Sequence, residues 1–169
     1  MSSSAGGYPY VGSASPAGAG GPPGQVIRSA EELAGWLAGR PPEEPAEPFT
    51  FVVDLDGTLR LAARRSEHVA CAGGRPVLSA GEIAFERSAD GGWAVEAVSN
   101  QSTGYCPDVT SWAAVEAALE RIGVGHPGGF THEVVFRRCP GCREINLVKE
   151  EDFVCAFCGG ELPAAWNVA

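Results

Sequence analysis

Four cysteines near the end of the chain have the types and spacing of metal ligands. They form two Cys-x-x-Cys pairs separated by twelve residues: Cys139, Cys142, Cys155 and Cys158. Thiolates are soft ligands, and two sulfurs on one tight turn can reach the same ion, so two such pairs can complete a tetrahedral site. A site closed by four sulfurs leaves no position for a substrate, which indicates a structural Zn²⁺. Two disulfides or a redox-active Cys-x-x-Cys pair are the alternatives.

The residues between and beyond the two pairs fit a small metal-bound unit. Residues 145–148 and 153–154 are predicted short strands, and the acidic residues 150–152 are the turn between them. Gly159-Gly160 suits the exit from the second pair. Residues 137–162 resemble the zinc-ribbon family, which implies a hairpin unit stabilised by Zn²⁺.

Composition restricts the classes of function. The 169 residues carry a formal net charge of −9, whereas non-specific binding of nucleic acid requires a basic face that displaces counterions. Arg137 and Arg138 form only a small basic group, so nucleic-acid binding is not favoured. The chain shows neither an apolar run long enough for a bilayer nor the start of a secretory signal, and thiolate ligands fit a reducing compartment. We therefore expect a cytoplasmic protein without a membrane partner.

The chain divides into four predicted regions. Residues 1–24 are rich in Gly, Ser, Ala and Pro and should be a disordered tail. Residues 25–48 should contain a short helix, over 26–37, and then a Pro/Glu linker. Residues 49–136 should form a β-rich domain, and residues 137–169 the zinc ribbon.

Short apolar stretches separated by Gly-rich turns indicate an antiparallel β-meander in the third region. The predicted strands are 51–53, 59–61, 67–72, 76–86, 93–98 and 130–138. A helix with an apolar face over about 110–122 should cover one side of this sheet. The predicted fold class is therefore α+β, a small antiparallel sheet covered by one helix, with an integrated C-terminal zinc ribbon.

A second motif with possible chemistry follows the first of these strands. The sequence Phe51-Val52-Val53-Asp54-Leu55-Asp56-Gly57-Thr58-Leu59 resembles the first motif of the haloacid-dehalogenase phosphatases. The resemblance implies Asp54 as nucleophile and Asp56 as general acid. The lysine and the late acidic pair of that family have no counterpart outside the predicted zinc hairpin. Asp56-Gly57 between two apolar stretches also predicts a tight β-hairpin, in which the two aspartates have no catalytic role.

Five further polar residues are candidates for a site: His68, Glu82, Asn100, Ser102 and Tyr105. Their surroundings resemble a pattern in a loosely defined set of bacterial proteins, with a His-containing strand, Ala-Gly-Glu, and Ser-Asn-x-Ser followed by a Tyr-x-Pro. The resemblance implies that these side chains converge, and buried polar clusters often mark sites. The alternative is a structural hydrogen-bond network within a Gly-rich sheet.

The sequence thus favours a zinc-binding cytoplasmic protein that acts as a protein-interaction or adaptor module. The closed metal site, the negative charge and the missing phosphatase lysine support this hypothesis. The alternative is an enzyme: a degenerate phosphatase that uses Asp54 and Asp56, or a hydrolase or transferase built on the five polar residues. A protein partner is expected, and the sequence does not identify it.

Overall fold

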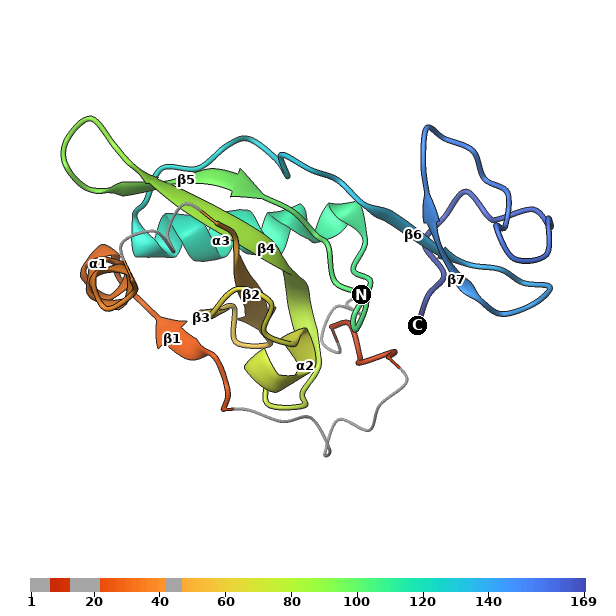
Figure 1. The fold of residues 1–169 in the computed structure, drawn as a ribbon, viewed down its shortest axis with the longest axis horizontal. Coiled ribbons are helices and arrows are strands. Elements are labelled where there is room, and N and C mark those ends of the chain that lie inside the picture. The colour runs from red at the N-terminus through yellow and green to blue at the C-terminus, as the bar shows by residue number, and fades with distance from the viewer. Residues whose placement is uncertain (1–6, 13–21, 42–46) are drawn as a thin grey trace.

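The fold is α+β, as the sequence predicts, and contains two antiparallel sheets of unequal size (Figure 1). The computed structural model describes residues 7–12, 22–41 and 47–169. The larger sheet has the strand order β1-β3-β2-β4-β5, and the smaller one pairs β6 with β7. The strands are β1 (Gln25–Ile27), β2 (Phe49–Asp54), β3 (Leu59–Ala62), β4 (Val77–Arg87), β5 (Trp93–Val98), β6 (Val135–Arg138) and β7 (Ile145–Val148). The helices are α1 (Ala30–Ala38), α2 (His68–Cys71) and α3 (Trp112–Ile122).

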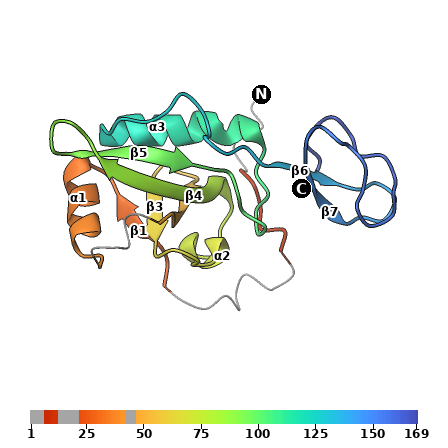
Figure 2. The same cartoon turned by 45° about the horizontal axis from the view of Figure 1, so that its top comes forward.

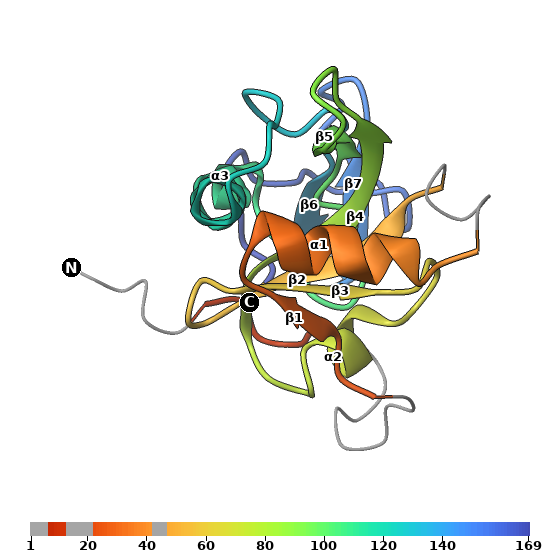
Figure 3. The same cartoon turned by 90° about the vertical axis from the view of Figure 1, so that its left-hand side faces the viewer.

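Two helices, rather than the single predicted one, cover one face of the large sheet. α3 presents an apolar stripe at helical spacing, with Val115, Leu119 and Ile122 buried, and ends at Gly123, whose φ of 89° is the left-handed conformation that glycine adopts easily. α1 lies across the β1–β3 end of the sheet (Figure 3). Both helices pack against the face of β2 that carries Phe49, Phe51 and Val53, and these three residues share one buried cluster with side chains of α1 and α3.

The opposite face of the sheet is covered only in part. The short helix α2 and the segment 7–12 pack against the sheet around Val52 and Tyr105. The prediction of a strand over 67–72 is wrong, because α2 occupies this stretch and the chain then turns back through Gly73 and Gly74, both with positive φ. Figure 2 shows α2 and α3 on opposite sides of β4.

The N-terminal predictions need two corrections. The helix begins at Ala30, not at residue 26, because Val26 and Ile27 pair with β3 and the extended residue Ser29 caps the helix by accepting a hydrogen bond from Glu32 N. Residues 7–12, predicted as part of the tail, lie on the fold, where Tyr8 exchanges two main-chain hydrogen bonds with Val77. Residues 1–6 and 13–21 of the predicted tail, and 42–46 of the predicted linker, lie outside the described residues.

The C-terminal unit, residues 135–169, extends beyond one end of the large sheet (Figures 1 and 2). Its hairpin differs from the prediction, since β7 pairs with β6 and not with residues 153–154. Val154 forms only an isolated bridge, with Glu161. The predicted strand 130–138 is likewise shorter, because only its last four residues form β6.

Candidate metal centre

The four predicted ligands come together in the C-terminal unit. The Sγ atoms of Cys139, Cys142, Cys155 and Cys158 all lie within 4.8 Å of one another. The Cys139–Cys158 and Cys142–Cys155 sulfurs are each 3.6 Å apart. A tetrahedral ion with metal–sulfur bonds of about 2.3 Å requires sulfurs about 3.8 Å apart, so this geometry fits a four-thiolate metal site.

The two Cys-x-x-Cys turns have the same backbone conformation. In the first, Cys139 N donates to Glu144 O, and Arg143 N donates to Cys139 O. In the second, Cys155 N donates to Gly160 O, and Gly159 N donates to Cys155 O. The residue after each second cysteine has a left-handed φ, 73° at Arg143 and 77° at Gly159. This repeated turn explains how two pairs that are distant in sequence present four sulfurs to one point.

Hydrogen bonds to sulfur favour the thiolate form at part of the site. Asn146 Nδ2 and Phe157 N donate to Cys155 Sγ at 3.4 and 3.3 Å. Burial raises the pKa of Cys155, but hydrogen bonds with the Asn146 side chain, the main chain of Cys158 and Phe157 and the Cys142 thiol outweigh it and lower the pKa to about 6. At Cys142, a hydrogen bond with the main chain of Glu144 favours the thiolate, but burial and the neighbouring thiols raise the pKa to about 12. Four thiolates at this distance therefore need a cation to ionise together.

Arg137 and Arg138 connect the C-terminal segment to β6. The guanidinium of Arg137, buried against Phe153, donates to the carbonyl oxygens of Pro163 and Ala164 at 3.0 and 2.6 Å. Arg138 donates to Val168 O and to Arg143 O. These two arginines are hydrogen-bond donors that stabilise the fold, a role that the sequence did not predict.

Asp54 and Asp56 lie in a hairpin turn between β2 and β3, as the hairpin prediction requires. Gly57 N donates to Asp54 O, and Asp54 N donates to Thr58 O, so the loop has three residues rather than two, with Gly57 at a φ of 82°. The Asp54 carboxylate accepts from the main chain of Asp56 and Thr58 and pairs with Arg60 at 3.0 Å. β2 is antiparallel to both of its neighbours, so the carboxylates do not stand at the end of a parallel strand.

Four of the five polar candidates bond to the main chain through their side chains. His68 Nε2 lies 2.8 Å from Gly81 O. The Asn100 side chain donates to Val134 O and accepts a hydrogen bond from Val134 N. The Tyr105 hydroxyl donates to Arg75 O. Ser102 Oγ accepts from Tyr105 N. Within the described ranges, no hydrogen bond joins the side chains of any two of the five. These four side chains stabilise the sheet and its loops, in line with the structural alternative. Glu82 differs, because its N–H donates to Ser99 Oγ while its carboxylate has no hydrogen bond within the described ranges.

Two other groups of possible ligands have simpler explanations. Glu116, Glu120 and His126 lie close together beside α3, but His126 Nδ1 is 2.7 Å from Pro127 O and Nε2 is 3.4 Å from Glu120, an arrangement that suits an ion pair. Cys71 and Cys106 are buried apart from the four-cysteine group, and burial raises the pKa of each thiol to about 12.

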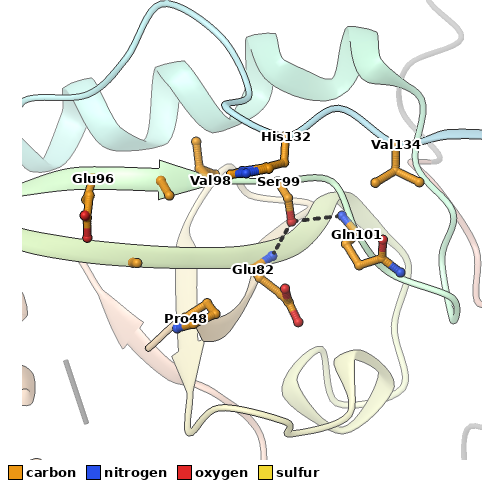
Figure 4. Close-up of a pocket in the computed structure, with 10 residues that line it drawn as sticks. Pro48, Glu82, Glu96, Val98, Ser99, Gln101, His132 and Val134 are labelled. Carbon is orange, nitrogen blue, oxygen red and sulfur yellow. Dashed lines mark hydrogen bonds between the residues drawn. The ribbon is translucent and has the colours of Figure 1, made fainter. Parts of the chain in front are cut away.

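One cavity in the structure was not predicted from the sequence. A cavity of ≈ 460 Å³ opens on the incompletely covered face of the large sheet, where Glu82, Glu96, Gln101 and His132 line it (Figure 4). Only Glu82 was a candidate. The sequence around Glu96 and His132 does not indicate that they line the same cavity. They come together only in the fold, through the bulge in the β4–β5 pairing and the bridge between Ser99 and His132.

Every helix in the described ranges is too short or too polar to cross a membrane. Comparisons with known protein families, with curated proteins and with solved structures found no match to this chain.

Proposed function

We propose that this protein is an interaction module whose C-terminal unit is stabilised by one structural Zn²⁺ and binds a partner protein. The observation that carries the proposal is the position of its exposed apolar side chains. Leu147, Val154 and Phe157 are 43%, 49% and 65% exposed, and they are the exposed large hydrophobic residues of the part of the chain that the structure describes. All three lie in the C-terminal unit, which supports a partner-binding surface on that unit.

The metal site and this surface are coupled by the chain itself. Phe157 lies inside the second Cys-x-x-Cys turn, between two ligands, and its N–H donates to Cys155 Sγ. An ion that holds Cys155 and Cys158 therefore also fixes the backbone that presents the Phe157 ring. A rigid aromatic anchor loses little entropy on binding, which favours its use as an interface contact.

The charge of the unit indicates the kind of partner. Residues 135–169 carry five acidic side chains and four basic ones, which include Arg137 and Arg138. Arg137 and Arg138, the residues that a nucleic-acid surface would need, are engaged with main-chain carbonyls. This supports a protein partner with an apolar pocket and a basic rim, rather than nucleic acid. Reduced thiolate ligands also fit a cytoplasmic location.

Zinc is the proposed metal because four thiolates in a closed tetrahedron suit Zn²⁺ and need no redox chemistry. Metal analysis of the purified chain should find about one zinc per chain. Iron in place of zinc would contradict the assignment. If the purified chain contained no metal and its mass showed the loss of the four thiol hydrogens, the cysteines would form two disulfides, and the metal site itself would be contradicted.

The interaction is tested with Phe157→Ser, because the substitution removes the apolar ring while leaving the four cysteines. Ala156→Ser, in the same turn, is the matched control, since Ala156 is exposed and supplies no large apolar surface. Proteins that co-purify with the wild-type chain should be lost from Phe157→Ser and retained by Ala156→Ser, with equal zinc in all three. The purified partner should then bind the chain directly. Unchanged capture by Phe157→Ser would overturn docking through this surface.

A further inference from the structure

The main chain of β7 faces away from β6 at two positions. Cys139 N donates to Glu144 O at 2.8 Å, which makes these two residues a hydrogen-bonded pair at the end of the β6–β7 ladder. Bonded and non-bonded pairs alternate along an antiparallel ladder, so Ile145 and Leu147 both belong to non-bonded pairs. Their N–H and C=O groups therefore point to the outer edge of the strand.

These outward groups have no partner in the part of the chain that the structure describes. Across residues 7–12, 22–41 and 47–169, no hydrogen bond reaches the N–H or C=O of Ile145 or Leu147. The Leu147 side chain stands opposite the buried Phe136 and is itself 43% exposed. Unpaired main chain and an exposed apolar side chain thus occur on one strand edge, and such an edge is a template for another strand.

The other outer strands lack this combination. Val95 and Val98 of β5 bond to the main chain of segment 125–131. On β6, the Asn167 side chain accepts from Arg138 N and donates to Arg138 O, which reproduces the two bonds of a neighbouring strand. β1 has only three residues. The described chain therefore fills the outer edge of β6 but leaves that of β7 open.

We propose that an extended segment of the partner protein pairs with β7 along this edge and lengthens the β6–β7 sheet by one strand. The four outward main-chain groups bond to the segment, as in other complexes where a peptide adds a strand to a sheet edge. An apolar residue of the segment lies beside Leu147, because directly paired residues share one face of a sheet. This inference rests on the proposed function, since it states how the partner of the C-terminal unit is held.

The charges at the two ends of β7 give the segment a direction. Residues 149–152, which follow the strand, are exposed and carry one basic and three acidic side chains, whereas Arg143 and Glu144 before it cancel. A basic residue at the N-terminal end of an antiparallel segment therefore lies beside the acidic end of β7. A second copy of this chain fits less well, because each copy carries a net charge of −9.

The test is a nuclear magnetic resonance titration of the intact purified chain with the peptide acetyl-Lys-Lys-Thr-Val-Thr-Val-Thr-amide. Saturable shifts should appear at residues 144–150. Peptide binding should slow amide hydrogen exchange at Ile145 and Leu147 but hardly change it at Asn146 and Val148, whose N–H groups already bond to β6. A contact made only by side chains does not produce this alternation.

Control peptides separate strand pairing from attraction between charges. The same peptide N-methylated at both valines keeps its charge and its side chains but loses the donors that face β7, and it should bind about tenfold more weakly. The reversed sequence, acetyl-Thr-Val-Thr-Val-Thr-Lys-Lys-amide, should bind about threefold more weakly, because its lysines lie at the end of β7 where the charges cancel.

Leu147→Pro is the matching change in the protein. It removes an N–H that points away from β6, so the ladder and the four cysteines stay in place, and the metal content should not change. Peptide binding should be lost. Leu147→Ala keeps the N–H and should weaken binding only about threefold. Glu31→Gln, on α1, loses an acidic charge far from β7 and should leave binding unchanged.

Four results would overturn the proposal. They are the absence of saturable shifts, equal slowing of exchange at all four residues of β7, equal binding of the N-methylated peptide, and concentration-dependent shifts at β7 in the chain alone, which would assign the edge to a second copy. The N-methylated peptide also tests the pairing without any change to the protein, so a folding defect in Leu147→Pro would not remove the test.

Capture of the partner protein distinguishes this proposal from the proposed function. A partner that is lost from Phe157→Ser but retained by Leu147→Pro would leave the surface on the C-terminal unit standing and would overturn the added strand. Retention of the partner by both variants would overturn the proposed function itself.

Discussion

The large sheet and the C-terminal unit of this chain are stabilised in different ways. The sheet and its helices share one cluster of buried apolar side chains that includes Phe49, Phe51 and Leu119. The unit has only small clusters, one of which contains Cys139, Cys155 and Leu162. A segment this short buries little apolar surface to offset its chain entropy, so we attribute its stability to the proposed metal site and to the arginine–carbonyl bonds.

Removal of a ligand tests this difference most strongly. Cys155→Ser should release the metal and unfold residues 135–169, because binding of a structural zinc contributes on the order of 10 kcal/mol to folding. The large sheet should remain folded. Hydrogen exchange read region by region measures both effects, and a chelator should reproduce them in the wild-type chain. Cys71→Ala is the control, because Cys71 lies in α2, packed against the large sheet, and its loss should leave the metal content unchanged. Retained amide protection in residues 135–169 after metal loss would contradict the comparison.

The large sheet should show the opposite dependence. Phe51 is fully buried, and Phe51→Ala should lower the free energy of unfolding of the sheet by about 3–5 kcal/mol through the cavity that it leaves. Urea denaturation followed by tryptophan fluorescence measures this loss, and metal content should not change under native conditions. Leu147→Ala, at an exposed position in the unit, should cost under about 0.5 kcal/mol. Similar losses in the two variants would mean that both regions share one mode of stabilisation.

Arg137 tests the second source of stability in the unit. Arg137→Ala leaves the carbonyl oxygens of Phe136, Pro163 and Ala164 without their donor, and each buried acceptor left unsatisfied costs about 1–3 kcal/mol. Hydrogen exchange of residues 162–168 should speed up while the metal stays bound. Lys149→Ala, on the exposed surface of the unit, is the control and should leave these exchange rates unchanged. Unchanged exchange rates in Arg137→Ala would show that Arg137 is only a surface charge.

The smallest expected effect is a pH dependence in the large sheet. Burial lowers the pKa of His68 below its usual 6.5, although the hydrogen bond to Gly81 O partly opposes this. The unfolded chain therefore takes up the proton first, and the stability that His68 contributes is present above pH 6.5 and is lost as the pH falls through the folded-state value. Denaturation of the sheet between pH 7 and 5 should show a slope that His68→Gln reduces. An identical slope in His68→Gln would assign the pH dependence to other groups.

Local signals predicted a large part of this molecule. The spacing of the four cysteines, the Asp56-Gly57 turn and the apolar stripe of α3 each involve residues within a few turns or positions of one another, and all three appear in the structure. The cysteine spacing predicted the ligands because a Cys-x-x-Cys turn is a self-contained structure that repeats without help from the rest of the fold.

The features that the sequence did not predict depend on contacts between distant segments. Val26 and Ile27 become a strand because β3 lies beside them, and β7 takes β6 as its partner across the first Cys-x-x-Cys turn. Nothing in the local pattern around Arg137 indicates that the chain returns 26 residues later with two carbonyl oxygens. The cavity at Glu82 and Glu96 likewise exists only after β4 and β5 have paired.

The placement of residues 7–12 has a consequence for the order of folding. Tyr8 packs on Trp166 and pairs with Val77, while Val11 N donates to Gly104 O. A ribosome makes this segment long before it makes Trp166, so the segment has no complete binding surface until Trp166 has been made. Contacts between such distant positions form late, after local elements and the main core. The earliest described residues should thus be the last to dock, and docking would tie the C-terminal unit to the finished sheet.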